Sequence, residues 1–163
     1  MNEKRKNRLR SIIRVCMVAV AIVLLVVAVG IPIANNAVAL GIQRELEALP
    51  MPADTTVQDA VSAAGKLVGS GNGMQYFGAV LLHSSLSYEE LDGHFAAYRT
   101  GLFDCRLEAQ TDVEICPGGQ ALNGDFSLSF SEAVSCEDYY ILYTWGSAPA
   151  ALRDWLNLDM RGH

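Results

Sequence analysis

The sequence predicts an α+β protein: one N-terminal transmembrane helix, then a small antiparallel sheet with one packed helix, in the order ββαβββ. Three observations predict it. Residues 15–34 form an unbroken apolar run, an Asn-Gly pair separates two strand-like segments, and a Ser-x-x-Glu helix start follows at 87–90. Four regions result: a basic start at 1–14, the apolar helix at 15–34, a neck and linker at 35–56, and a domain at 57–163.

The apolar run has the length and composition of a transmembrane helix. Its residues include no charged or amide side chain, and at about 1.5 Å per residue they make a helix as long as a bilayer core is thick. Residues 2–14 carry a charge balance of +5, and residues 15–163 a balance of −11. Because basic flanks stay in the cytoplasm, we expect a single-pass signal anchor of the cell membrane, with its N-terminus cytoplasmic and its C-terminal domain outside. The lipid bilayer is then the first expected partner.

A cleavable signal peptide is the alternative for the same segment. The basic start, the apolar stretch and the small residues Ala37-Val38-Ala39 would suit cleavage before Leu40. The apolar run, however, exceeds the ~7–15 residues that are usual in a signal peptide. We therefore expect an uncleaved anchor, and keep a secreted domain, cleaved near Ala39, as the alternative.

The outer domain has the pattern of short strands around one helix. The capping box at 87–90 begins a helix expected over 87–100, and residues 138–145 are the most strand-like stretch of the chain. The Asn72-Gly73 pair predicts a hairpin turn, because both residues accept positive φ. The other expected strands lie at 60–69, 74–83, 102–108, 112–116 and 125–130.

Three cysteines, Cys105, Cys116 and Cys136, fall in the outer domain, so at most one pair can form within it. A hairpin turning at Gln110-Thr111 would place Cys105 opposite Cys116. Such a disulfide would contribute about 2–3 kcal/mol to the free energy of unfolding. Three isolated thiols are the alternative, because only geometry decides the pairing.

No local motif indicates catalysis, a metal or a cofactor. The glycines of 69–73 lack the Lys-Ser/Thr of a phosphate-binding loop, and a strand follows them instead of a helix. Neither zinc spacing nor an acidic calcium loop is present in the sequence. A small Cys/His-dependent enzyme stays an alternative. It would need a nucleophile beside a base, the candidates being Cys116, Ser84, His83 and His94.

Aromatic side chains gather on the strand predicted at 138–145. Tyr139, Tyr143 and Trp145 share one face, since successive residues of a strand alternate. Core packing is the expected role. The alternative is a carbohydrate-binding or wall-polymer-binding module, in which these rings stack on a sugar.

Several segments together resemble small single-pass (signal-anchor) membrane proteins of bacteria, an uncharacterised group. The resemblance covers most of the chain and is carried by the basic start, the apolar span, LEALP, GNGMQYFG, Ser-x-Glu-Glu, DYYILYTWG and RGH. It implies a class and a topology, and it assigns no site residue.

The expected function is therefore that of a non-enzymatic, membrane-anchored, extracytoplasmic module. We expect it to bind an unidentified membrane or envelope protein, or another envelope component. Nucleic acid is not an expected partner, because the balance of −11 after residue 14 repels phosphates.

Overall fold

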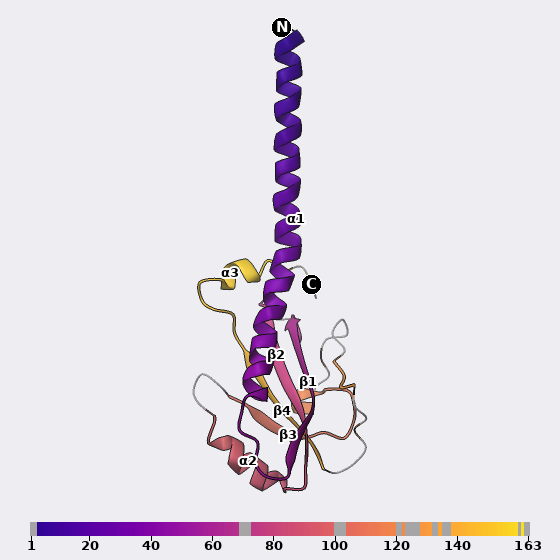
Figure 1. Cartoon of the computed structure of the whole chain (residues 1–163), viewed down its shortest axis with the longest axis vertical. Helices are drawn as coiled ribbons and strands as arrows, with labels where there is room; N and C mark the ends of the chain where they lie inside the picture. Colours follow the sequence, from indigo (N-terminus) through magenta and orange to yellow (C-terminus); the bar gives the residue numbers. More distant parts are fainter. Residues whose placement is uncertain are drawn as a thin grey trace.

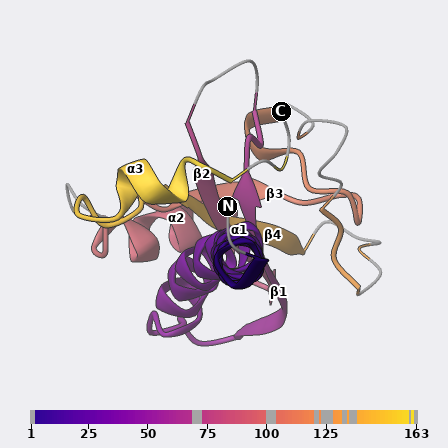
Figure 2. The same ribbon diagram turned by 90° about the horizontal axis from the view of Figure 1, so that it is seen from above.

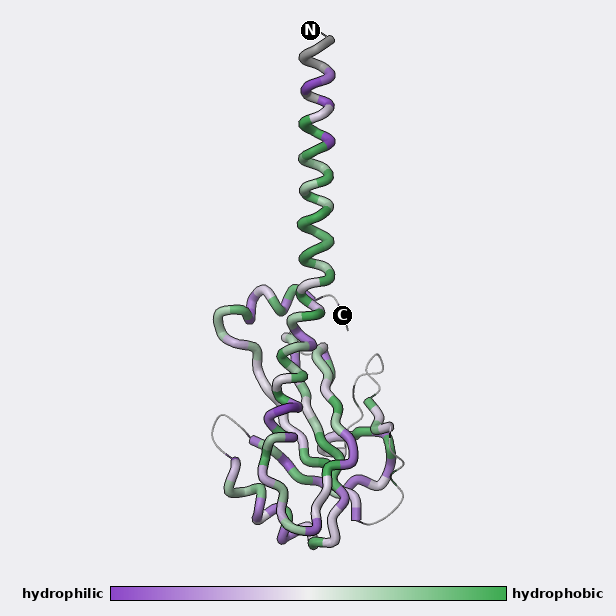
Figure 3. The backbone as a smooth tube through the Cα atoms, in the orientation of Figure 1, coloured by the Kyte–Doolittle hydropathy of each residue, from purple (hydrophilic) through white to green (hydrophobic). Residues whose placement is uncertain are grey.

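The apolar run and its flanks form a single helix, α1 (Glu3–Glu47), in the computed structural model. The structure describes residues 3–68, 73–99, 104–119, 122, 128–131, 134, 138–159 and 161. The long helix stands out of a small domain, and its apolar colouring runs along the part clear of that domain (Figures 1 and 3). It is long and apolar enough to cross a membrane, and it lies near the N-terminus.

Residues 35–47, expected as part of a neck, continue α1 and pack on the domain. Pro32 lies inside the helix and removes one backbone donor, but the helix continues through it. We call residues 10–34 the free part of α1 and residues 35–47 its docked part. Only the short stretch after Glu47 is irregular before the first strand begins at Thr55.

Four antiparallel strands form one sheet in the order β1-β2-β4-β3, which confirms the predicted α+β class. β2 and β4 lie at the centre, and their inner residues are buried because both faces of the sheet are covered. Two short helices complete the described elements, together with a turn of 3-10 helix at Pro117–Gly119. The bounds are β1 (Thr55–Gly65), β2 (Gln75–Ser84), α2 (Tyr88–Ala96), β3 (Arg106–Ala109), β4 (Tyr139–Gly146) and α3 (Arg153–Leu156).

The strand predictions hold for β2 and β4 and need correction around β3. The hairpin expected between 102–108 and 112–116 does not form: β3 pairs with β4, and Glu114 makes only an isolated bridge with Ser129. The apolar β4 offers a long hydrogen-bonding edge, which the predicted hairpin would have left open. The tip of the predicted turn at 69–73 and most of the strand predicted at 125–130 lie outside the described residues.

The docked part of α1 covers one face of the sheet. Its buried residues Asn35, Ala39 and Leu46, together with half-buried Ile42, recur at helical spacing. The helix comes so close that a Cβ on Gly78 of β2 would lie 2.8 Å from the backbone nitrogen of Gln43. Glycine at this position therefore lets helix backbone and strand backbone meet.

Helix α2 packs beside the docked part of α1. The predicted capping box is present: the Ser87 hydroxyl accepts the Glu90 amide at 3.3 Å, and the Glu90 carboxylate accepts the Ser87 amide at 2.9 Å. Leu91 and Phe95 of α2 are buried in one cluster with Leu46. The helix ends at Ala96, before the predicted end at 100.

The opposite face of the sheet is covered by the chain between β3 and β4. Ile115, Leu122, Phe130 and Val134 pack there on residues of β2 and β4 that include Phe77, Leu81, Ile141 and Tyr143. The domain thus has one face covered by helices and one covered by irregular chain.

Replacing Gly78 by alanine is expected to lower the free energy of unfolding by about 1–3 kcal/mol, because the new methyl group overpacks against α1 backbone. Gly93→Ala in α2 is the matched control. A Cβ there meets nothing within 4 Å, so that variant should be neutral or more stable, since alanine is the better helix former. Urea denaturation of the full chain in detergent micelles, followed by tryptophan fluorescence, measures both. Equal stability of the two variants would contradict the close contact.

Candidate functional site

The residues that join α1 to the end of the chain form the most elaborate polar cluster of the described structure. Asn35, directly after the apolar run, is the first fully buried residue in the described part of α1. The Asn35 side chain is wholly buried, which is costly for an amide unless each polar atom finds a partner. We call the cluster of Asn35, Tyr76, Leu156, Asp159 and Arg161 the junction.

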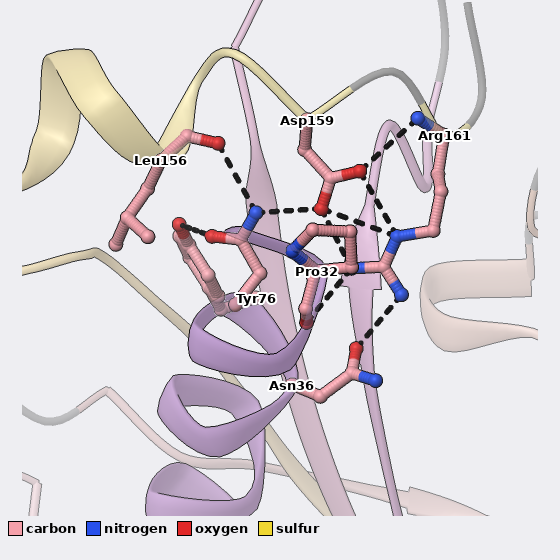
Figure 4. Close-up of polar contacts among 7 residues, drawn as sticks. Pro32, Asn36, Tyr76, Leu156, Asp159 and Arg161 are labelled. Atoms are coloured by element: carbon pink, nitrogen blue, oxygen red, sulfur yellow. Dashed lines mark hydrogen bonds and ion pairs between the residues drawn. The ribbon is translucent and has the colours of Figure 1, made fainter. Parts of the chain in front are cut away.

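Asn35 is satisfied from three sides, by Tyr76, Leu156 and Asp159, which are labelled in Figure 4. Its amide nitrogen donates to the Asp159 carboxylate at 2.7 Å and to the Leu156 carbonyl oxygen at 3.1 Å. Its amide oxygen accepts the Tyr76 hydroxyl at 2.7 Å. One side chain of α1 therefore holds β2 and the C-terminal segment (residues 152–159 and 161) together.

Arg161 closes the junction on its outer side. Its guanidinium forms an ion pair with Asp159, with Nη2 2.7 Å from Oδ2, while Nε donates to Oδ1 at 3.0 Å. It also donates to the Asn36 side chain at 2.9 Å and to the Pro32 carbonyl oxygen at 3.3 Å. The C-terminal segment is thus fastened to α1 over the turn at 32–36 (Figure 4).

The junction fixes the charge state of its two acidic groups. Burial alone would raise the pKa of Asp159, but hydrogen bonds from Arg161 and Asn35 outweigh it and hold that pKa below its ordinary value. Burial, reinforced by the nearby Asp159 charge, raises the pKa of Tyr76. At neutral pH the carboxyl is therefore ionised and the phenol remains a donor.

A groove of about 530 Å³ lies beside the junction, between the free part of α1 and the C-terminal segment. Its α1 wall is apolar and its other wall is made by Leu158, Asp159 and Arg161. The α1 residues that line it are Leu24, Val27, Ala28, Ile31 and Pro32.

A second, polar cleft of about 380 Å³ lies between α2 and β3. An ion pair of Arg99 with Asp92 forms one wall, and its hydrogen bond holds the pKa of Asp92 below the ordinary value. Arg99 Nε also donates to the Cys105 carbonyl oxygen at 2.7 Å. The exposed pair Asp104 and Arg106, 3.5 Å apart, stands at the rim. The cleft offers charged groups for a polar contact.

The aromatic residues expected on β4 do not form one exposed platform. Tyr143 is buried, donates its hydroxyl to Glu108, and has a pKa raised to about 12, chiefly by burial. Tyr139 is half-buried against His83, and Trp145 is 36% exposed with its ring 4.8 Å from that of Phe77. Tyr143 therefore cannot stack on a sugar, and Trp145 offers the most ring surface of the three.

Cys105 and Cys116 are separate free thiols in the structure. The proposed disulfide depended on the hairpin register, and β3 pairs with β4 instead. Burial raises the pKa of Cys105, and burial with nearby Glu114 raises that of Cys116, so both thiols stay protonated at neutral pH. Cys136 lies outside the described residues.

The candidate nucleophiles and bases are not paired in the described part of the chain. The Ser84 hydroxyl lies 2.7 Å from that of Thr55, and it accepts the Leu86 amide. The ring of His94 forms its hydrogen bond with the Pro50 carbonyl oxygen at 2.7 Å. Among the described residues there is also no group of three or more His, Cys, Asp or Glu that could hold a metal ion.

The junction is what sequence reasoning missed. Its only local signal is an amide pair, Asn35-Asn36, placed directly after an apolar run. Comparison with known proteins adds no relative: no family model, curated protein or solved structure matches the chain. The arrangement of residues is therefore the whole basis for a function.

Asn35→Ala is expected to lower the free energy of unfolding by about 1–3 kcal/mol, because it leaves the buried Asp159 and Tyr76 groups short of a partner. Asn36→Ala is the control on the next residue. Its exposed side chain makes one bond to Arg161, so its effect should stay within about 0.5 kcal/mol. Urea denaturation compares them, and equal losses would contradict the role given to Asn35.

The ion pair in the junction predicts a pH dependence of stability. The folded pKa of Asp159 lies below the unfolded value of about 3.9. The ionised carboxylate therefore adds to the free energy of unfolding above that pH, and this stabilisation is lost as acid protonates the folded carboxyl. Asp159→Asn should remove this part of the dependence. Stability measured from neutral pH down to about pH 3 for both proteins checks it, since other carboxyls titrate equally in each. Parallel curves would contradict the prediction.

Proposed function

We propose that the chain is a single-pass, signal-anchored membrane protein whose α+β domain is held outside the cell membrane and binds a protein or envelope component without catalysis. The observation that carries this proposal is the free part of α1. Its large apolar side chains from Ile12 to Val29 are all more than one third exposed, and the apolar window is not buried by any part of the domain. Such a surface is stable in lipid and costly in water.

The charge distribution supports the proposed orientation. Six basic residues precede or begin the apolar run, whereas the remaining chain is strongly acidic. Basic residues next to a span favour the cytoplasmic side. The domain is then on the outer face, joined to the span by continuous helix.

The docked part of α1 supports an uncleaved anchor over a secreted domain. Ala39, at the expected cleavage position, is 1% exposed and packs in the domain core with Tyr76 and Leu156. Cleavage there would remove Asn35 and leave the Tyr76 hydroxyl and the Asp159 carboxylate without that partner. Cleavage near Ala39 would therefore destabilise the domain, and this favours an uncleaved helix.

A binding role, and not a catalytic one, agrees with the chemistry of the domain. Cys105 and Cys116 are protonated thiols, and Ser84 has no histidine partner among the described residues. The polar cleft between α2 and β3 presents exposed charges of both signs, which suits a reversible polar interface. We place the partner contact at this cleft.

An arginine in the middle of the free part should reduce membrane retention. Leu24→Arg places a charge where insertion costs about 2.5–3.5 kcal/mol, whereas Val57→Arg adds the same charge to the surface of β1 and should leave retention unchanged. The assay is alkaline extraction of membranes with intact-mass measurement of the retained chain. A soluble wild-type species that begins near Leu40 would refute the anchor.

Binding at the polar cleft is tested by a photo-crosslinking residue at Asp104, whose side chain is 71% exposed. We expect a defined adduct with a membrane or envelope component, and its loss when Arg106→Glu reverses a charge at the rim. Glu45, exposed on α1, is the control position and should give no adduct. Equal labelling from both positions would contradict a partner site at the cleft.

A further inference from the structure

The C-terminal segment carries the most exposed large apolar side chains of the domain. Leu152 is 50% exposed, Trp155 65% and Leu158 55%. Elsewhere in the described domain, the next such side chain is Tyr88 at 42%. Three neighbouring side chains of this size at the surface mark a contact site.

These three side chains are close together along the segment. They recur every third residue around α3, and the Leu158 amide donates to the Trp155 carbonyl oxygen at 3.2 Å, as in a tight helical turn. Leu156 and Asp159, which lie between and after them, are 4% and 1% exposed and face the domain. Leu156 and Asp159 therefore fix the segment 152–159 to the domain, while Leu152, Trp155 and Leu158 are open. The polar residues Arg153, Asp154 and Asn157 are exposed as well.

The segment is held at the level where α1 leaves the domain. Asn35 binds the Leu156 carbonyl oxygen at 3.1 Å, and Arg161 binds the Pro32 carbonyl oxygen at 3.3 Å. Figure 1 shows α3 at the end of the domain from which the free part of α1 emerges, and Figure 2 shows α3 beside that helix. The exposed apolar side chains thus lie next to the outer end of the apolar run.

The groove makes the two apolar surfaces continuous. Leu158 lines it together with Leu24, Val27 and Ile31 of the free part of α1. Whatever medium surrounds these α1 residues therefore also reaches Leu158. If the medium is lipid, the segment lies at the boundary between acyl chains and headgroups.

We propose that residues 152–158 form a second membrane contact, with Leu152, Trp155 and Leu158 inserted into the outer leaflet at this boundary. The inference rests on the proposed function, since it takes α1 to span the membrane. Tryptophan favours this depth, because its ring is apolar and its N–H still reaches polar atoms. Arg153, exposed on the same short helix, can reach lipid phosphates with its guanidinium.

The test uses the chain's two tryptophans. Trp145→Phe leaves Trp155 as the sole reporter, and Trp155→Phe leaves Trp145, on β4, as the matched control. Both full-length variants are reconstituted into vesicles of phosphatidylethanolamine and phosphatidylglycerol, some containing lipids brominated near the headgroup end of the acyl chain. Flotation is measured on the same samples.

We expect Trp155 to lose most of its emission to the brominated lipid and to be shielded from aqueous acrylamide, whereas Trp145 keeps its emission in the same vesicles. Chains that float while Trp155 stays open to acrylamide and unquenched by lipid would overturn the second contact and leave the anchor intact. Chains that do not float would overturn the proposed function, and this inference with it.

Discussion

The contact between the docked part of α1 and the sheet is the interaction on which the rest of the structure depends. Gly78 has no side chain at the point where Gln43 backbone approaches, so the helix lies directly on β2. Leu46 fills one core cluster and Ala39 another, and α2 and the C-terminal segment pack against these clusters. Without the helix, one face of a four-stranded sheet would be open to water, with a large loss of apolar burial.

Asn35 lies where α1 changes from a helix with exposed apolar side chains to a helix packed on the sheet. Before Ile31 the large apolar side chains of the free part of α1 are exposed, whereas after Asn35 the helix buries Ala39 and Leu46 against the sheet. A buried amide at such a boundary costs free energy unless it is fully bonded, and Tyr76, Asp159 and Leu156 bond it. Because these partners come from a central strand and the C-terminal segment, the same bonds fix the position of the C-terminal segment.

Local patterns predicted much of the fold and none of the junction. The apolar helix, the capping box at 87–90 and the strand β4 follow from periodicity and neighbouring residues, and these were predicted. The pairing of β3 with β4 and the bond from Asn35 to Asp159, 124 residues apart, depend on tertiary packing. A long-range polar contact leaves no periodic pattern in the sequence. The sequence therefore predicted Asn35 as the first residue after the transmembrane helix, and did not predict that it is buried in the domain.

The unbroken course of α1 has a mechanical consequence. Its 45 residues make a rod about 68 Å long, with the domain fixed to one end and the basic residues at the other. If α1 spans the membrane as proposed, it adjusts to bilayer thickness by tilting, and a continuous helix passes that tilt to the domain packed on it. The height and orientation of the domain relative to the lipid surface would then vary with membrane thickness.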